Sequence, residues 1–134
     1  MKLIEKQGNI FSELDDSKFI CCSISRDFVS RTEFFNQLDS RFKLRENLNK
    51  IYLYGQSVIL IDKIILLIVK DKFWLKPDYD LLEYSLLELK MKFSNKIKEI
   101  RFFKSDFVGF NYIKMRDILN KVFESTSIQP IIYL

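Results

Sequence analysis

The chain has 134 residues, 48% of them hydrophobic, which fits one compact domain whose core covers well over half of the unfolded surface. No histidine is present. Imidazole general bases, Ser-His and Cys-His nucleophile pairs and histidine metal sites are therefore excluded for this chain alone. The net charge of +4, from 22 basic and 18 acidic residues, is explained by a solvated surface of mixed charge, so we expect no nucleic-acid partner.

The two cysteines, Cys21 and Cys22, are adjacent within an apolar run. They fit neither the CxxC spacing of a metal or redox site nor a disulfide framework, so we interpret them as buried side chains in a reducing compartment. The longest apolar stretch, from Ile64 to Val69, is far too short to span a bilayer. The sequence therefore predicts a single cytoplasmic domain over residues 1–134, with no metal, no cofactor and no membrane contact.

In chain order, the first predicted strand covers Lys2–Lys6 and is followed by a turn at Gln7-Gly8-Asn9. The continuous apolar run Phe19–Ile24 predicts a strand that is buried on both faces. Thr32 can cap a helix, since apolar residues then recur at three- and four-residue intervals. These residues are Phe34, Phe35, Leu38 and Phe42, with Leu44 and Leu48 continuing in a shorter second helix.

Two Val-, Ile- and Leu-rich segments come next, Ser57–Asp62 and Lys63–Lys70, and only a charged Asp-Lys break separates them. This pattern predicts a strand pair with a tight turn, and Tyr52-Leu53-Tyr54 leads into it.

The second half alternates helices and strands. The longest helix is predicted over Asp78–Lys96, with Pro77 just before or at its first turn, where a missing amide proton costs nothing. A strand over Lys98–Phe103, a helix over Asn111–Phe123 and a strand over Ile128–Tyr133 follow. The residues expected to face inward in the last helix are Ile113, Ile118, Leu119 and Val122.

Pro130 lies within the last predicted strand, and because proline cannot donate to a ladder we expect an edge or strand-start position for it. The order strand, helix, strand, helix, strand favours parallel pairing with right-handed crossovers. The fold class predicted is α/β, a three-layer α/β/α sandwich with a mixed, mostly parallel sheet. A ligand site of such a sheet lies outside the carboxyl ends of its strands, among the loops Ser25–Thr32, Lys70–Asp78 and Lys104–Asn111.

Five short segments follow one another at compatible spacing. They are Gly8-Asn9-Ile10-Phe11, Cys22-Ser23-Ile24-Ser25, Leu67-Ile68-Val69-Lys70 with Lys76-Pro77-Asp78-Tyr79, Val122-Phe123-Glu124 and Ile131-Ile132-Tyr133. In this order they resemble the small macro domains of the terminal ADP-ribose protein glycohydrolase type, over almost the whole chain. Macro domains bind ADP-ribose, and some remove it from proteins or nucleic acids, so the resemblance implies the same fold and an ADP-ribose-like ligand.

The resemblance also implies where a ligand would be held. In the family an acidic residue of the first turn binds the adenine amino group; Asn9 holds that place here, next to Ile10, and can still accept a hydrogen bond. An ordinary turn residue after Gly8 is the alternative for Asn9. Ser25 lies at the exit of the second strand.

The two glycine-rich segments that cradle the pyrophosphate and distal ribose in the family have no recognisable counterpart in this chain. Residues 28–33 and 104–110 replace them, with Gly109 the one glycine left. Arg31 and Lys104 can supply charge to a phosphate, and solvated basic side chains are the alternative.

Lys70 stands where the resembling enzymes carry the lysine that attacks the anomeric carbon of the distal ribose. Alignment from the last helix puts Val108 at the place of the assisting aspartate, but a shifted loop would deliver Asp106 instead. A nucleophilic lysine needs a lowered pKa. The alternative for Lys70 is an ordinary lysine at the point where a strand meets water.

Aromatic residues in the loops allow a base to stack, on Trp74 or Phe107, or else they pack within the protein. The first functional hypothesis is a divergent macro domain that binds, and sequesters, a nucleotide-derived small molecule without efficient turnover. A composition biased toward Ile, Lys, Asn and Phe is typical of A/T-rich genomes such as those of many viruses, phages and parasitic bacteria. A viral origin would place the protein in a host cytoplasm.

Two other hypotheses remain open. The second is an ADP-ribosyl hydrolase that uses Lys70 as nucleophile. The third is a ligand-free interaction module, for example a homodimer, which uses an aromatic contact surface formed by Phe73, Trp74, Phe107 and Phe110.

Overall fold

The computed structural model describes residues 1–51 and 55–134. Its strands are β1 (Ile4–Lys6), β2 (Lys18–Ser25), β3 (Val58–Ile61), β4 (Ile64–Lys70), β5 (Glu99–Phe103) and β6 (Gln129–Tyr133). Its helices are α1 (Glu33–Phe42), α2 (Leu44–Leu48), α3 (Tyr79–Phe93) and α4 (Tyr112–Phe123), and a short 3-10 turn, η1, spans Lys104–Asp106. The predicted sequence of elements is confirmed, apart from η1, which was not expected. The predicted lead-in at Tyr52-Leu53-Tyr54 lies outside the described residues.

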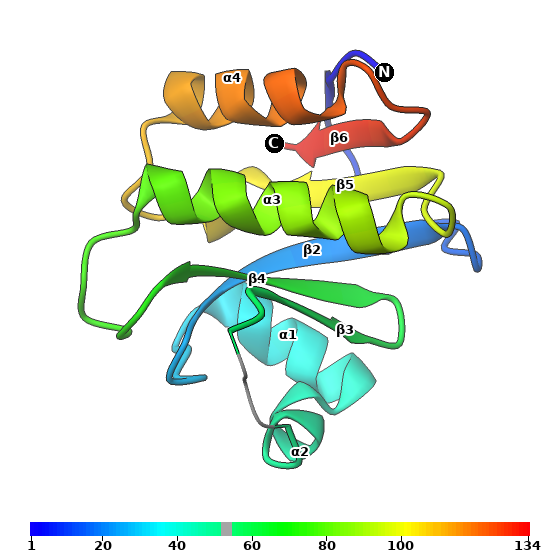
Figure 1. The fold of residues 1–134 in the computed structure, drawn as a ribbon. Coiled ribbons are helices and arrows are strands. Elements are labelled where there is room, and N and C mark those ends of the chain that lie inside the picture. The colour runs from blue at the N-terminus through cyan, green and yellow to red at the C-terminus, as the bar shows by residue number, and fades with distance from the viewer. Residues whose placement is uncertain (52–54) are drawn as a thin grey trace.

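The strands form one six-stranded sheet in the order β1-β6-β5-β2-β4-β3 (Figure 1). All neighbouring strands are parallel except β3, which pairs antiparallel with β4. The tight turn between β3 and β4 is made at Asp62, which adopts a left-handed conformation with φ 53°. The mixed, mostly parallel sheet and the hairpin at one side are therefore confirmed.

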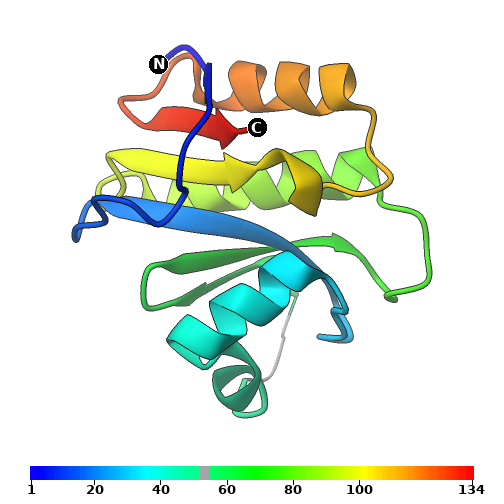
Figure 2. The ribbon, with the colours of Figure 1, turned by 180° about the vertical axis from the view of Figure 1, so that it is seen from behind.

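Helices cover both faces of the sheet. Helices α3 and α4 lie on the face toward the viewer in Figure 1, and α1 and α2 lie on the opposite face, which Figure 2 shows from behind. Side chains alternate between the two layers along the central strands: Cys21 and Ile65 pack in the α3 and α4 layer, whereas Cys22 and Leu66 pack in the α1 and α2 layer. The three-layer sandwich thus follows from strands that are apolar on both faces.

Pro130 is in an interior strand, so the edge position allowed for it was wrong and the strand-start position holds. β6 lies between β1 and β5, and Pro130 is opposite Ile100 of β5. Backbone amides point alternately to the two sides of a strand. Because the amide of Gln129 donates to Lys98 beside β5, the missing amide of Pro130 faces β1, whose pairing begins only at Ile131.

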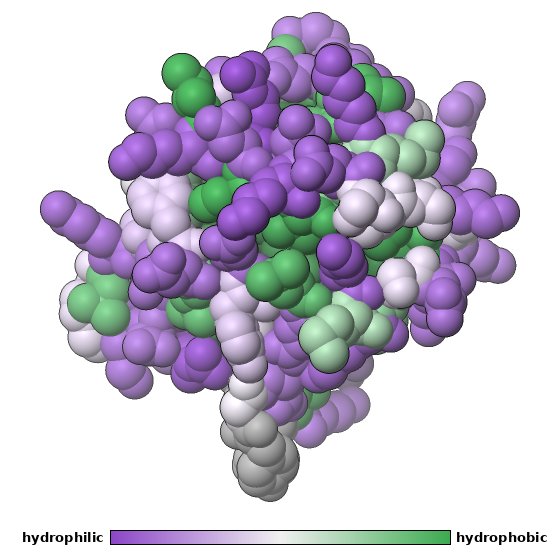
Figure 3. Space-filling view, turned by 45° about the horizontal axis from the view of Figure 1, so that its top comes forward, coloured by the Kyte–Doolittle hydropathy of each residue, from purple (hydrophilic) through white to green (hydrophobic). Residues whose placement is uncertain are grey.

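Helix α4 does not bury all the residues that its sequence pattern predicted. Ile113 was expected to face inward but is 60% exposed, and Met115 takes the core position instead. Figure 3 looks onto the side that carries these helices, where apolar patches interrupt a mainly hydrophilic surface. None of the helices in the described ranges combines the length and apolar character that a membrane crossing requires.

A buried arginine joins the turn after β1 to the sheet. Arg101 of β5 is 3% exposed, and its Nη1 donates to the carbonyl oxygens of Ile10 at 2.8 Å and Ser12 at 2.5 Å. Its Nε donates to Glu99 at 2.7 Å. The guanidinium therefore satisfies backbone groups that the turn leaves unpaired.

We expect Arg101→Met to lower the free energy of unfolding by about 3–5 kcal/mol, because two carbonyls and a carboxylate lose their donor in a buried setting. Urea denaturation measures the loss. Arg116→Met is the matched control: Arg116 pairs with Glu5 at 3.1 Å, but the pair is solvated, so its loss should be much smaller. Equal losses in the two variants would contradict the role given to Arg101.

Candidate functional site

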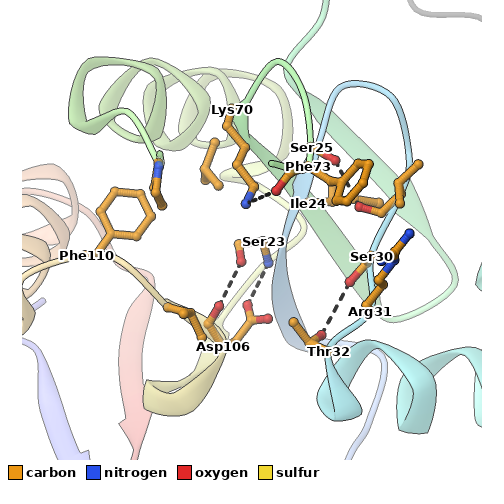
Figure 4. A pocket seen from close by; sticks show the side chains of 14 residues that line it. Ser23, Ile24, Ser25, Ser30, Arg31, Thr32, Lys70, Phe73, Asp106 and Phe110 are labelled. Carbon is orange, nitrogen blue, oxygen red and sulfur yellow. Dashed lines mark hydrogen bonds between the residues drawn. The ribbon is translucent and has the colours of Figure 1, made fainter. Parts of the chain in front are cut away.

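A pocket of about 290 Å³ lies at the carboxyl ends of the central strands (Figure 4). Its lining comes from the end of β2 with the following loop, from the end of β4 with the following loop, and from the segment between η1 and α4. These segments belong to the three loops that the sequence placed at this edge of the sheet. The position agrees with the usual ligand site of open α/β sheets.

The loop after β2 is held in shape by its own side chains. The hydroxyl of Ser25 hydrogen-bonds the carboxylate of Asp27, and its Oγ is 3.0 Å from the carbonyl oxygen of Val29. The amide of Val29 donates to Asp27 at 3.3 Å, while Phe28 adopts a left-handed conformation with φ 59°. A side-chain network therefore takes the place of the glycines that would otherwise make this turn.

Asp27 also reaches across to the loop after β4, since its carboxylate accepts the amide of Phe73 at 3.3 Å. Partial burial raises the pKa of Asp27, but hydrogen bonds from Ser25, Val29 and Phe73, together with the nearby charge of Lys72, outweigh this and hold the pKa below its ordinary value. The ionised carboxylate thus joins two walls of the pocket. Our sequence interpretation missed Asp27, although a serine and an aspartate spaced Ser-x-Asp at a strand exit are typical of such a turn.

Both cations of the pocket are held against Phe73. The ammonium of Lys70 donates to the carbonyl oxygen of Phe73 at 2.8 Å, and the guanidinium of Arg31 lies 4.8 Å from the centre of the Phe73 ring. Figure 4 shows the two side chains on either side of this residue, next to the pocket. A ligand phosphate could draw either cation away at modest cost, because neither is paired with a carboxylate in the described chain.

The third wall contributes a buried carboxylate. Asp106 in η1 is 3% exposed, and it accepts the amide of Ser23 at 2.7 Å, with Sγ of Cys22 at 3.7 Å. Its backbone oxygen also accepts the hydroxyl of Ser23 at 3.0 Å. Burial raises the pKa of Asp106 to about 7, against the opposing effect of these hydrogen bonds. Asp106 therefore titrates much closer to neutral pH than an ordinary aspartate does.

Four of the predicted site residues line the pocket: Ser25, Arg31, Lys70 and Asp106. The predicted catalytic candidates, Lys70 and Asp106, thus come together from positions 36 residues apart in the sequence (106 minus 70). Whether they act on a substrate stays a prediction.

The other predicted residues lie outside the pocket lining. The side chain of Asn9 accepts the amide of Phe11 at 2.9 Å, as an ordinary turn residue does, and Ile10 is 7% exposed. Trp74 is 67% exposed and stands edge-on to Phe73. Lys104 lies over the ring of Tyr112, 4.3 Å from its centre.

Phe107 and Gly109 also belong to the framework rather than to the lining. Phe107 is 5% exposed and packs near Phe102 and Phe110, so the stacking role considered for it does not fit its place in the core. Gly109 has φ +90°, and a Cβ there would come within 2.9 Å of Pro77. The remaining glycine thus lets the segment before α4 approach the start of α3 closely.

A second hollow, of about 460 Å³, adjoins the pocket and shares Thr32 and Val108 with it. Its walls include Phe34 and Phe103, whose ring centres are 4.9 Å apart, and the side chains of Glu33 and Gln37. The two hollows therefore lie next to each other beside the start of α1. Within residues 1–51 and 55–134, no cluster of carboxylates or cysteines is suited to a metal ion.

Comparison with solved structures shows what this fold is similar to. The macrodomain of Thermus aquaticus DarG superposes with a TM-score of 0.76 and 11% identity, covering 98% of this chain and 97% of that chain. The macrodomain of Mycobacterium tuberculosis DarG gives 0.75 and 12%, covering 98% and 96%. A macrodomain protein from Streptomyces coelicolor gives 0.74 and 10%, covering 99% of each chain.

No protein-family model and no curated sequence matches the chain. The similarity to the three solved structures shows that the chain has the macrodomain fold. The resemblance seen in the sequence is therefore confirmed at the level of the fold. An identity of 10–12% does not carry an activity from one protein to another.

We expect Gly109→Ala to destabilise the protein, because the left-handed backbone costs an L-residue about 1–2 kcal/mol and the new methyl group also collides with Pro77. Gly55→Ala is the matched control, since Gly55 also has φ +90° but no atom of the described residues lies within 4 Å of the place that its new methyl group would take. Thermal unfolding of both variants separates the two effects, because Gly55→Ala has only the backbone strain whereas Gly109→Ala also has the collision with Pro77. A control that loses as much stability as Gly109→Ala would show that Pro77 does not matter.

Replacing Asp106 should change how stability depends on pH. A carboxyl whose pKa rises on folding stabilises the folded state at low pH, and this contribution is lost as pH rises toward the folded value of about 7. Relative to Asp106→Asn, the wild type should therefore lose about 3 kcal/mol between pH 5 and pH 8. Urea titrations at the two pH values measure the difference.

Asp27→Asn is the control for this experiment. The pKa of Asp27 is lowered, so its contribution is constant above pH 5 and is lost only in stronger acid. Parallel stability curves for the wild type and Asp106→Asn from pH 5 to pH 8 would refute the buried, proton-binding state of Asp106.

Proposed function

We propose that this protein, which has the macrodomain fold, binds an ADP-ribose-like nucleotide and does not turn it over efficiently. The proposal is carried by one observation: the pocket at the carboxyl ends of β2, β4 and β5 holds Lys70 and Arg31, and the hollow next to it is lined by the half-buried ring of Phe103. A diphosphate suits the cations and the nearby start of α1, while a base suits the half-buried ring of Phe103 in the adjoining hollow. In this role the protein sequesters a nucleotide-derived signal.

Three features argue against efficient hydrolysis. The ammonium of Lys70 is bonded to a carbonyl oxygen of its own loop rather than held beside a carboxylate. Val108, which stands where the resemblance places the assisting aspartate, is apolar and 71% exposed. Asp106 lines the pocket but is hydrogen-bonded to the backbone of β2. A ligand would thus meet binding groups without a formed acid-base pair.

Isothermal titration with ADP-ribose tests the proposal, and we expect saturable binding at micromolar strength. Arg31→Ala should weaken binding about tenfold, because it removes a charge-assisted contact to phosphate. Lys104→Ala is the matched control: this lysine is outside the lining and lies over Tyr112, so the affinity should not change.

Absence of heat at millimolar ADP-ribose, together with no nucleotide copurifying with the protein, would sink the ADP-ribose proposal. Equal losses in Arg31→Ala and Lys104→Ala would instead place the ligand elsewhere on the surface.

The second candidate function is an ADP-ribosyl hydrolase. It is favoured by the presence of Lys70 and Asp106 in one pocket lining. Its test is release of ADP-ribose from a modified glutamate, which Lys70→Ala must abolish. Unchanged release in that variant would eliminate Lys70 as the nucleophile.

The interaction-module hypothesis loses part of its proposed surface. Phe107 is buried, and Phe73 and Phe110 line the pocket, so only Trp74 of the four aromatic residues is prominently exposed. A monomer by light scattering with no copurifying protein would count further against it.

A further inference from the structure

We propose that Asp106 sets the charge preference of the pocket, so that an anionic nucleotide binds to the protonated form and its binding takes up a proton. The ionised form would favour uncharged ligands. This inference rests on the proposed function, because it concerns a nucleotide in the same pocket, but it assigns Asp106 a role other than catalysis.

The geometry places the carboxylate in the wall of the pocket. Asp106 is itself a lining residue that is 3% exposed, and Ser23, whose amide it accepts at 2.7 Å, lines the same pocket. Figure 4 shows Asp106 and Ser23 joined at the pocket wall. A ligand in the pocket would therefore lie beside this buried carboxylate, whose own charge water screens poorly.

Neighbouring cations do not neutralise the carboxylate. Lys104, on the same turn, lies over the Tyr112 ring, and Lys70 at the end of β4 donates to Phe73. Arg31, in the loop before α1, is stacked on Phe73. Among the described residues Asp106 therefore forms no ion pair, so its negative charge adds to the field of the pocket alongside the positive charges of Lys70 and Arg31.

Three other titratable groups lie near Asp106 or in the adjoining hollow: the thiols of Cys21 and Cys22, and the carboxyl group of Glu33. From β2, burial and then the charge of Asp106 raise the pKa values of the Cys21 and Cys22 thiols, which stay neutral. Glu33 of α1 lines only the adjoining hollow, where it adds further negative charge. Asp106 is the group that changes charge close to pH 7, since its pKa is raised to about 7 by burial.

A bound diphosphate would raise the proton affinity of Asp106 further, because two like charges cannot approach in a low-dielectric site without cost. Linkage then requires the reverse effect: protonation of Asp106 strengthens diphosphate binding. A single coupled proton changes the affinity by at most tenfold per pH unit. A purely structural Asp106, which only accepts the Ser23 amide, would give no such coupling.

Isothermal titration of the wild-type protein with ADP-ribose at pH 6, 7 and 8 tests the inference. We expect the affinity to fall about tenfold from pH 6 to pH 8. Repeating the titration at pH 7 in buffers of different ionisation enthalpy counts the protons, and we expect a net uptake of protons, of at most about one per ligand bound. The pyrophosphate diester of ADP-ribose does not titrate in this range, so the proton must come to the protein.

Two controls isolate the carboxylate. Adenosine, which carries no phosphate, should take up no proton if it binds the wild type. Asp106→Asn should bind ADP-ribose equally from pH 6 to pH 8, without proton uptake. The wild-type proton count needs no variant, so it remains decisive even if Asp106→Asn folds poorly.

The outcomes separate this inference from the proposed function. Binding of ADP-ribose to the wild type with no proton uptake, or with the same pH dependence in Asp106→Asn, would overturn the inference and leave the proposed function standing. Absence of binding by either protein at every pH would overturn the proposed function and the inference with it.

Discussion

The parallel pairing of β2 with β4 is the constraint on which the rest of the structure depends. Both strands are apolar on both faces, so neither can lie at the surface, and both must be covered by helices on each side. Their register brings Ser25 opposite Lys70, which places two loops side by side at the carboxyl edge of the sheet. The pocket exists because these two exits meet there.

Side chains rather than glycines shape the pocket. Asp27 joins the two exit loops through Ser25 and Phe73, and Phe73 in turn holds Lys70 and Arg31. Such a network fixes the loop at the cost of room for a ligand, since each added side chain fills space that a glycine leaves open. It also keeps two cations close to the pocket without committing either to a carboxylate.

The buried carboxylate and the cations in one pocket have opposite effects on an anionic ligand. In the proposed complex Lys70 and Arg31 would attract a phosphate, whereas ionised Asp106 in η1 would oppose it. The balance would then depend on the protonation of Asp106, because burial raises its pKa to about 7. Within the described residues Lys70 forms no ion pair with a carboxylate, and its ammonium donates to the carbonyl oxygen of Phe73.

The sequence by itself determined the order and type of the elements, the sandwich and the three loops of the site, because apolar runs, helical periods and capping residues are local signals. Four of the site residues predicted from the sequence, Ser25, Arg31, Lys70 and Asp106, line the pocket, and their roles stay a prediction. Only the tertiary structure decided that Pro130 starts an interior strand and that Ile113 is exposed. Tertiary packing likewise made Asp27 the link between the loops and buried Phe107 beside Phe102. These outcomes depend on which segments from distant parts of the chain meet, and no short-range pattern contains that information.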